Sequence, residues 1–308
     1  NHSDEFALEC ANVAKRMGIK VYLFENNKLM PTPIISYTIR RLKATGGINI
    51  TASHNPKEDN GFKAYNATGS QILPNEAKII VKNMPRSKDI LDLASIIPQA
   101  KTQKPIAYVN YEKITDEFFR DVIRNATIDK DFLNKDCLIK KQPIVFTGHH
   151  GTTSELMPKF LKSLGFKKVY VVPTQAKISS QFEGSPISNP EDNRSFEAAM
   201  AYADKKKATI IFGADPDGDR MAIGFKKTNR WRFLNGNEMG IIYTYYILTH
   251  ANFDKPPYIL STHMSTNYID RIAKKFNAKV IRTKTGFKWM CNLIDEYEKE
   301  GRMVVAFE

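Results

Sequence analysis

Apolar residues with helical spacing and short apolar runs typical of strands alternate along most of this 308-residue chain. Phe6, Cys10, Val13 and Met17 recur every three or four residues, and Gly18 is suited to end that helix. Such alternation predicts βαβ units around largely parallel sheets. Strands are expected at residues 19–24, 47–51, 143–147, 168–172, 208–212, 258–261, 279–282 and 303–307, and helices at 6–17, 32–42, 153–164, 191–205, 238–248 and 265–276.

The predicted fold class is α/β, with three consecutive domains of mixed or parallel sheet. We place them at residues 1–135, 136–232 and 233–308. Thr32 and Pro33 look like the N-cap and first residue of the second helix. The segment 83–111 is less periodic and is not assigned. Because the sequence stops inside the last apolar run, we expect it to be part of a longer chain.

Composition and charge limit the function classes. Hydrophobic residues make up 42% of the chain and charged residues 26%, as in ordinary globular proteins. No apolar run reaches the roughly 18 residues of a membrane span. The three cysteines, Cys10, Cys137 and Cys291, form no C-x-x-C pair, which favours a reducing cytoplasmic setting over a zinc or disulfide framework. The net charge of +13 comes without a nucleic-acid-binding signature, so we expect no nucleic-acid or membrane partner.

A serine lies directly after the strand expected at residues 47–51, in the sequence Thr-Ala-Ser-His-Asn-Pro. Ligands bind at the carboxyl ends of parallel strands, so Ser53 is well placed for nucleophilic or phosphoryl chemistry. An ordinary turn in which Ser and Asn bond their own backbone is the alternative. Because adjacent side chains of an extended segment point apart, His54 is expected to be a poor general base for Ser53.

Three carboxylates follow the strand expected at residues 208–212, in Asp-Pro-Asp-Gly-Asp-Arg. Asp215, Asp217 and Asp219 can converge on one hard cation, and Mg²⁺ needs few protein ligands. An EF-hand is excluded, because its sixth position would be Arg220 instead of Gly and its twelfth Lys226 instead of Glu. A solvated acidic turn without metal is the other alternative, but crowded carboxylates repel one another unless a cation neutralises them.

Four segments, in this order, resemble the signatures of the α-D-phosphohexomutase family, closest to its phosphoglucomutase and phosphopentomutase branch. The first resembles the family's active-serine segment and the second its metal loop. The third resembles the substrate loop of domain III, and the last the start of the sugar-recognition loop. They are residues 51–63, with Asn-Gly-Phe-Lys at its end; 215–220; 283–290, Thr-Lys-Thr-Gly-Phe-Lys-Trp-Met; and 305–308, Val-Ala-Phe-Glu.

The resemblance implies a fold of four α/β domains around a cleft, of which the fourth is absent from this sequence. It also implies an isomerase that moves a phosphoryl group from C1 of a sugar to C6 or C5, through a phosphoserine enzyme and a sugar bisphosphate. Phosphoglucomutase is the preferred activity, with phosphomannomutase or phosphopentomutase as alternatives. A catalytically impaired sugar-phosphate-binding protein and a metal-dependent phosphatase are alternatives of other classes.

The resemblance also implies roles for individual residues and partners. Ser53, Lys63 and Arg220 are the expected catalytic residues. A phosphoserine oxygen at Ser53 joins Asp215, Asp217 and Asp219 around Mg²⁺. The expected substrate-binding residues are His54, Lys284, Thr285 and Glu308. The partners are then a small phosphosugar and a sugar 1,6-bisphosphate that serves as activator and intermediate, bound by a monomer or homodimer. His149 and His150 are expected to have structural roles only.

Overall fold

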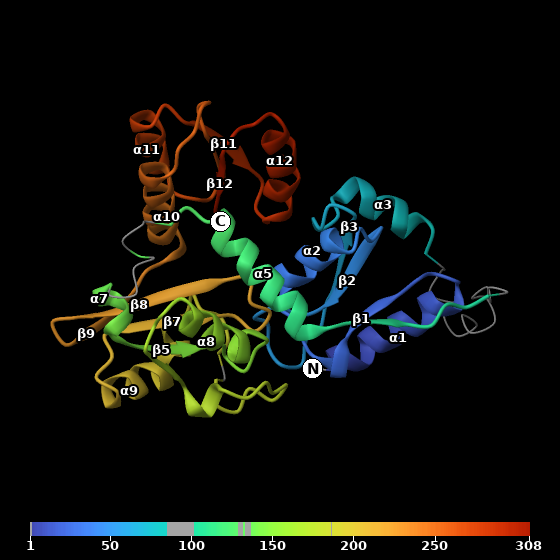
Figure 1. Ribbon diagram of the computed structural model, residues 1–308, viewed down its shortest axis with the longest axis horizontal. Helices are drawn as coiled ribbons and strands as arrows, with labels where there is room; N and C mark the ends of the chain where they lie inside the picture. The colour runs from blue at the N-terminus through green and yellow to red at the C-terminus, as the bar shows by residue number, and fades with distance from the viewer. Residues whose placement is uncertain (1, 85–101, 129–131, 133–136, 186) are drawn as a thin grey trace. The chain divides into compact units, whose positions relative to one another are not determined.

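The computed structural model describes residues 2–84, 102–128, 132, 137–185 and 187–308, which fall into two compact units (Figure 1). Unit 1 comprises residues 1–121 and unit 2 residues 122–308. The helix α5, Tyr111–Asn125, passes from one unit to the other. The predicted boundary at 135–136, like most of the unassigned segment 83–111, lies outside the described residues.

Unit 1 contains two separate pairs of strands with helices beside them. Its α2 helix packs against β2 so closely that a Cβ at Gly47 would lie 2.5 Å from Ile39 Cδ1. Ile34, Ile39 and Tyr65 are buried among these elements. Besides α5, the elements are α1 (Ser3–Arg16), β1 (Tyr22–Phe24), η1 (Glu25–Asn27), α2 (Thr32–Arg41), β2 (Gly46–Ile50), β3 (Phe62–Asn66), α3 (Pro74–Lys82) and β4 (Ala107–Val109).

The strand pairing in unit 1 corrects the sequence-based expectation of a largely parallel sheet. β1 pairs with β4 in parallel, but β2 pairs with β3 antiparallel, with Asn49 opposite Lys63. The strand β3 was not predicted, and only Asn49 of β2 is buried, so β2 is less enclosed than a strand of a doubly covered sheet. The N-cap of α2 is Pro31 instead of the predicted Thr32, which is the first residue of the helix. The segment that contains Ser53, residues 51–61, therefore joins two antiparallel strands.

The first part of unit 2 is built on a five-stranded mixed sheet in the order β6-β5-β7-β8-β9. β5, β6 and β7 are parallel, and the hairpin strands β8 and β9 continue the sheet antiparallel. Helix α9 packs on β5 and β7 around Phe196 and Ile211, and α8 packs on β5 and β6 around Ile144 and Leu161. The elements are α7 (Leu138–Lys141), β5 (Pro143–Thr147), α8 (Thr153–Ser163), β6 (Lys168–Val171), η3 (Pro173–Gln175), η4 (Asn193–Phe196), α9 (Glu197–Lys205), β7 (Ile210–Ala214), β8 (Met221–Lys227) and β9 (Arg230–Phe233).

The second part of unit 2 is a three-stranded parallel sheet in the order β11-β10-β12. Leu248, Ile259 and Val305 belong to its buried core. The predicted helix at 265–276 is shorter than expected, because it begins only at Ile269, after a bend and a turn at residues 265–268. The elements are α10 (Gly236–His250), β10 (Tyr258–Thr262), α11 (Ile269–Lys275), β11 (Lys279–Thr283), α12 (Lys288–Lys299) and β12 (Val304–Ala306). Within the described residues, every helix is too short or too polar to cross a lipid bilayer.

Gly213 in β7 is a position where the sheet admits no side chain, and we expect Gly213→Ala to destabilise the protein. An added Cβ would lie 2.3 Å from Cε1 of Phe196, whose ring is fully buried and stacked on Phe233. Overpacking of this kind costs about 1–3 kcal/mol. Urea denaturation should show a lower midpoint for Gly213→Ala, whereas Gly236→Ala, where the nearest atom is 3.9 Å away, should match wild type. Equal midpoints for the two variants would contradict this packing.

Candidate functional site

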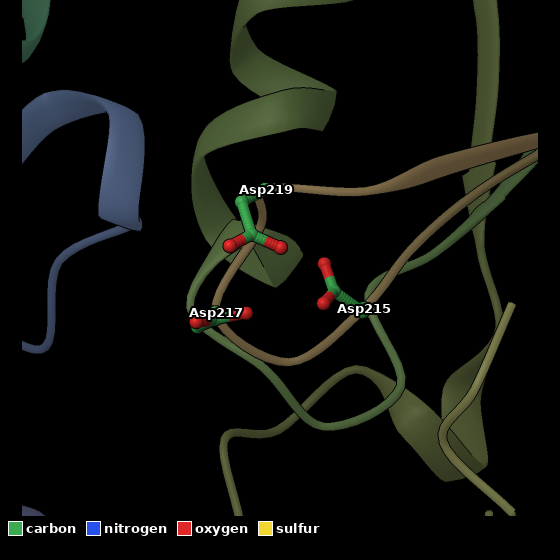
Figure 2. A group of neighbouring side chains, drawn as sticks. All are labelled: Asp215, Asp217 and Asp219. Carbon is green, nitrogen blue, oxygen red and sulfur yellow. The ribbon is translucent and has the colours of Figure 1, made fainter. Parts of the chain in front are cut away.

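The aspartate loop, residues 215–220, leaves the carboxyl end of β7 and returns as β8. Gly218 adopts a left-handed backbone with φ of 70°, and its N–H donates to the Asp215 carbonyl at 3.1 Å. The N–H of Arg220 donates to Oδ1 of Asp215 at 2.9 Å. These bonds curl the loop back on itself, so that the three aspartate side chains gather around one point (Figure 2).

The three carboxylates form a cluster in which one oxygen from each lies within 4.8 Å of the others. Asp215 and Asp217 are buried, at 0% and 4% exposure, and Asp219 is exposed. Burial, followed by the charges of Asp217 and Asp219, raises the pKa of Asp215 from 3.8 to about 8. An all-oxygen, acidic and partly buried set fits a hard divalent cation, which would relieve the repulsion that raises this pKa. The described residues thus contain a cluster that could hold a metal ion.

The two histidines that precede α8 have structural contacts, as the sequence predicts. The His149 ring is fully buried, with Nδ1 2.8 Å from the Ala214 carbonyl oxygen and Nε2 3.2 Å from that of Ser195. Burial lowers the pKa of His149. His150 Nδ1 lies 2.8 Å from the Lys177 carbonyl oxygen, and its Nε2 accepts a hydrogen bond from the Gly184 N–H at 3.1 Å. His149 therefore holds the backbone immediately before Asp215.

Arg220 extends from the end of the aspartate loop and is partly exposed. Its Nη1 lies 3.8 Å from Oε1 of Glu191, and both side chains are well solvated. An ion pair of this length and exposure contributes little to stability. The guanidinium is therefore held only weakly and is available for an anionic ligand.

The serine segment, residues 51–61, is closed at its base by backbone bonds between β2 and β3. Thr51 N–H donates to the Gly61 carbonyl at 2.9 Å, and a Cβ at Gly61 would lie 2.4 Å from Thr51 O. Ser53 has a φ of 56°, a left-handed conformation that is uncommon for a non-glycine residue, and its N–H donates to Thr51 Oγ1 at 2.9 Å. Such backbone strain persists where the surroundings enforce it, often at functional sites.

The orientation of His54 corrects the sequence-based expectation that it points away from Ser53. Ser53 Oγ lies 3.3 Å from His54 Nδ1, a hydrogen-bonding distance. The expectation assumed an extended backbone, and the left-handed turn at Ser53 brings the two neighbouring side chains to the same side. Lys63 lies in β3 opposite Asn49, within the strand instead of in the preceding loop. Ser53, His54 and Lys63 all belong to unit 1.

The predicted substrate residues of unit 2 lie on two chain segments that the structure brings together. The N–H of Gly286 donates to Oε1 of Glu308 at 2.8 Å, which joins the loop after β11 to the end of the segment after β12. Lys284 Nζ lies 5.0 Å from the centroid of the Trp289 ring. Lys284, Thr285 and Glu308 are all exposed. Two contacts left no signal in the sequence: the Trp289 ring lies under Lys284, and Thr152 donates to the Pro216 carbonyl of the aspartate loop.

Models of the phosphoglucomutase/phosphomannomutase α/β/α domains match nearly the whole chain: domain I at residues 1–90, domain II at 116–228 and domain III at 235–308. The chain belongs to this family. It is 40% identical over 308 residues to a phosphomannomutase of Mycoplasmoides pirum, covering 100% of this chain and 55% of the relative. It is 31% identical to a phosphoglucomutase of Staphylococcus aureus strain N315, covering 99% of this chain and 53% of the relative.

This phosphohexomutase chain therefore spans about half the length of the curated relatives it matches. Among solved structures, a putative phosphomannomutase from Thermus thermophilus aligns with a TM-score of 0.75 at 21% identity, covering 99% of this chain and 63% of that one. At that identity the likeness shows a shared fold. Family membership and the α/β class with mixed sheets, both predicted from the sequence, are confirmed.

We expect Mg²⁺ to raise the melting temperature of the full-length protein more at pH 8 than at pH 6. Because the pKa of Asp215 is raised to about 8 in the folded protein, the folded state holds a proton that the unfolded state releases. The metal-free protein therefore loses stability as the pH rises from about 4 to about 8. The cation needs the ionised carboxylate, so its stabilising effect grows over the upper part of this range. Thermal melts with and without Mg²⁺ at pH 6 and pH 8 measure this shift in melting temperature.

Two asparagine variants provide the controls for this experiment. Asp217→Asn removes a charge of the cluster and should abolish most of the Mg²⁺-induced shift. Asp295→Asn removes a carboxylate from α12, where Asp295 pairs with Lys299, and should leave the shift intact. A shift that is the same at both pH values, or that survives in Asp217→Asn, would count against the cluster as the metal site.

Proposed function

We propose that the full-length protein is a Mg²⁺-dependent phosphosugar mutase that moves a phosphoryl group between C1 and C6 of a hexose phosphate. The observation that carries the proposal is the cluster of Asp215, Asp217 and Asp219, two of which are buried. The chain also contains the serine segment, in which Ser53 has a left-handed backbone. Family membership supports it. Because this chain spans about half of its relatives' length, the activity is proposed for the complete protein.

Ser53 is the residue that we propose carries the phosphoryl group. Its phosphoryl group passes to a free hydroxyl of the sugar monophosphate, and the other phosphate of the resulting bisphosphate returns to Ser53. The contact between Ser53 Oγ and His54 Nδ1 at 3.3 Å supports a role for His54 beside the transferred group, as a donor to phosphate or substrate oxygen.

The metal would be held by Asp215, Asp217, Asp219 and an oxygen of the phosphorylated Ser53. When bound, Mg²⁺ supplies positive charge that neutralises the charge developing on the transferring phosphoryl group. Arg220 adds a bidentate contact to the same phosphate, and its loose pairing with Glu191 leaves it able to do so. Lys63, fixed in the backbone of β3, is the proposed general acid and base for the sugar hydroxyl.

Lys284, Thr285 and Glu308 are the proposed contacts to the rest of the substrate. All three are exposed, and Gly286 and Glu308 join the two segments that carry them. Lys284 and Thr285 would contact the phosphate or the sugar of the substrate. The carboxylate of Glu308 accepts hydrogen bonds and suits sugar hydroxyl groups.

The relatives do not favour glucose phosphate over mannose phosphate, since the 40% identical relative is named phosphomannomutase and the 31% identical one phosphoglucomutase. Our preferred activity from the sequence, phosphoglucomutase, therefore stays beside phosphomannomutase, with a pentose phosphate as a third candidate. Glucose 1-phosphate, mannose 1-phosphate and ribose 1-phosphate, each with Mg²⁺ and a bisphosphate activator, separate the three.

The proposal also covers the location, the oligomeric state and the domain division of the protein. We propose a cytoplasmic enzyme, monomeric or dimeric, with a sugar 1,6-bisphosphate as activator and without nucleic-acid or membrane partners. The domain division at 1–135, 136–232 and 233–308 also stays a proposal. The boundary at 232–233 falls between the family-model matches at 116–228 and 235–308, which supports it, whereas the domain II match begins at residue 116, well before the proposed boundary at 135–136.

Ser53→Ala should lower turnover of the full-length protein by roughly 10³-fold or more, because no other group can take the nucleophile's place. Mass spectrometry of the wild-type protein should find phosphate on Ser53. Ser163→Ala is the matched control: Ser163 is exposed, its hydroxyl bonds the Phe160 carbonyl of its own helix, and its loss should not change the rate.

The products distinguish the proposed mutase from the two other classes. Release of inorganic phosphate in excess of the isomeric sugar phosphate would identify a phosphatase. Binding of the bisphosphate without turnover in the presence of Mg²⁺ would identify a sugar-phosphate-binding protein. Either result would overturn the proposed reaction.

A further inference from the structure

The segment 148–152, Gly-His-His-Gly-Thr, which we call the supporting loop, connects β5 to α8 beside the aspartate loop. β5 is the sheet neighbour of β7, and Thr147 at the end of β5 is paired with Gly213 near the end of β7. The two loops therefore leave the same end of two adjacent parallel strands. The supporting loop holds none of the three carboxylates, and the proposed reaction assigns it no role.

The supporting loop donates hydrogen bonds to the backbone carbonyls on both sides of Asp215. The carbonyl of Ala214, immediately before Asp215, lies 2.8 Å from Nδ1 of His149. The carbonyl of Pro216, immediately after it, accepts from the N–H of Thr152 at 2.8 Å and from its Oγ1 at 3.0 Å. Both peptide groups that flank the buried carboxylate are thus fixed from outside the aspartate loop.

The contact between the two loops is as close as backbone allows. A Cβ at Gly151 would lie 2.2 Å from Cα and 2.3 Å from O of Pro216, so only glycine fits there. The His149 ring is fully enclosed, with its other nitrogen 3.2 Å from the Ser195 carbonyl oxygen and its edge packed on Phe196 at a centroid distance of 5.1 Å. The His149 ring therefore cannot move without disturbing the packing around Phe196.

We propose that His149 and Thr152 are positioning residues for the metal centre, because they hold the Ala214 and Pro216 carbonyls and so aim the Asp215 carboxylate at the cation. The inference rests on the proposed metal-dependent function. Three crowded carboxylates repel one another and would spread apart before a cation arrives. Because the backbone is held on both sides of Asp215, its side chain stays in place in the metal-free site. Residues that hydrogen-bond to metal ligands orient those ligands in the same way in other proteins.

The neighbouring threonines at 152 and 153 give a matched test in the full-length protein. Thr152→Val removes the Oγ1 donor to Pro216 and should weaken Mg²⁺ binding about threefold to tenfold, the effect of losing one hydrogen bond. Thr152→Ser keeps the donor and should bind like wild type. Thr153→Val is the control, because Thr153 is the next residue and is more deeply buried than Thr152, but its Oγ1 has no hydrogen-bond partner among the described residues. Calorimetric titration with Mg²⁺ measures all four proteins.

Two variants of His149 test its contact with the Ala214 carbonyl. Asn places its side-chain nitrogen near the position of Nδ1, and Gln near that of Nε2. His149→Asn should therefore keep the bond to Ala214 and lose less Mg²⁺ affinity than His149→Gln. Thermal melts without Mg²⁺ show whether each variant is folded at the temperature of the titration.

The outcomes separate this inference from the proposed function. If the wild-type protein binds no Mg²⁺, the metal centre itself is wrong. If the wild type binds Mg²⁺ but Thr152→Val, Thr153→Val and both His149 variants bind it equally well, the metal centre stands and the positioning role is wrong. A lower melting temperature of Thr152→Val with unchanged Mg²⁺ affinity would mark a purely structural bond and also overturn the inference.

Discussion

Repulsion among three carboxylates at the end of β7 is the constraint on which the rest of this structure depends. Burial of Asp215, followed by the charges of Asp217 and Asp219, raises the pKa of Asp215 to about 8, so a proton or a cation among these oxygens stabilises the loop. Buried like charges are costly, and chains keep them where binding recovers the cost. The five-stranded sheet, the glycine at 213 beside Phe196 and the supporting loop all fix the backbone that carries them.

The serine segment and the aspartate loop are both held in one conformation by hydrogen bonds and by a close contact at a glycine. In each, a proposed functional side chain lies on an irregular turn that backbone hydrogen bonds hold in place. A glycine allows the close approach in both cases: Gly61 against Thr51, and Gly151 against Pro216. The left-handed backbone of Ser53 belongs to this arrangement. Fixed backbone lets a short loop hold one geometry without a large core of its own.

The sequence predicted the elements better than their pairing. β5 was predicted at its observed bounds, and α8 and β7 to within two residues, because buried strands and amphipathic helices are visible in apolar periodicity. Periodicity says nothing of which strand lies beside which, so the antiparallel β2–β3 pair was missed. Residue types predicted the aspartate cluster. The support from His149 and Thr152 passes through backbone carbonyls, which leave no trace in sequence, and His54 was misplaced because one positive φ at Ser53 overrides the alternation of an extended segment.

In the proposed reaction, the groups of this chain that would contact the sugar lie at the exposed end of unit 2, at Lys284, Thr285 and Glu308. Glu308 already accepts a bond from the Gly286 N–H, so a sugar hydroxyl must use the carboxylate's remaining lone pairs, in an orientation that this bond fixes. Lys284 is likewise restrained by the face of Trp289. Glucose and mannose phosphates offer the same phosphate to the aspartate loop and differ only in the direction of one hydroxyl. In the proposed reaction, Glu308 would contribute to discrimination between them, to a degree set by how rigidly the Gly286 N–H holds its carboxylate.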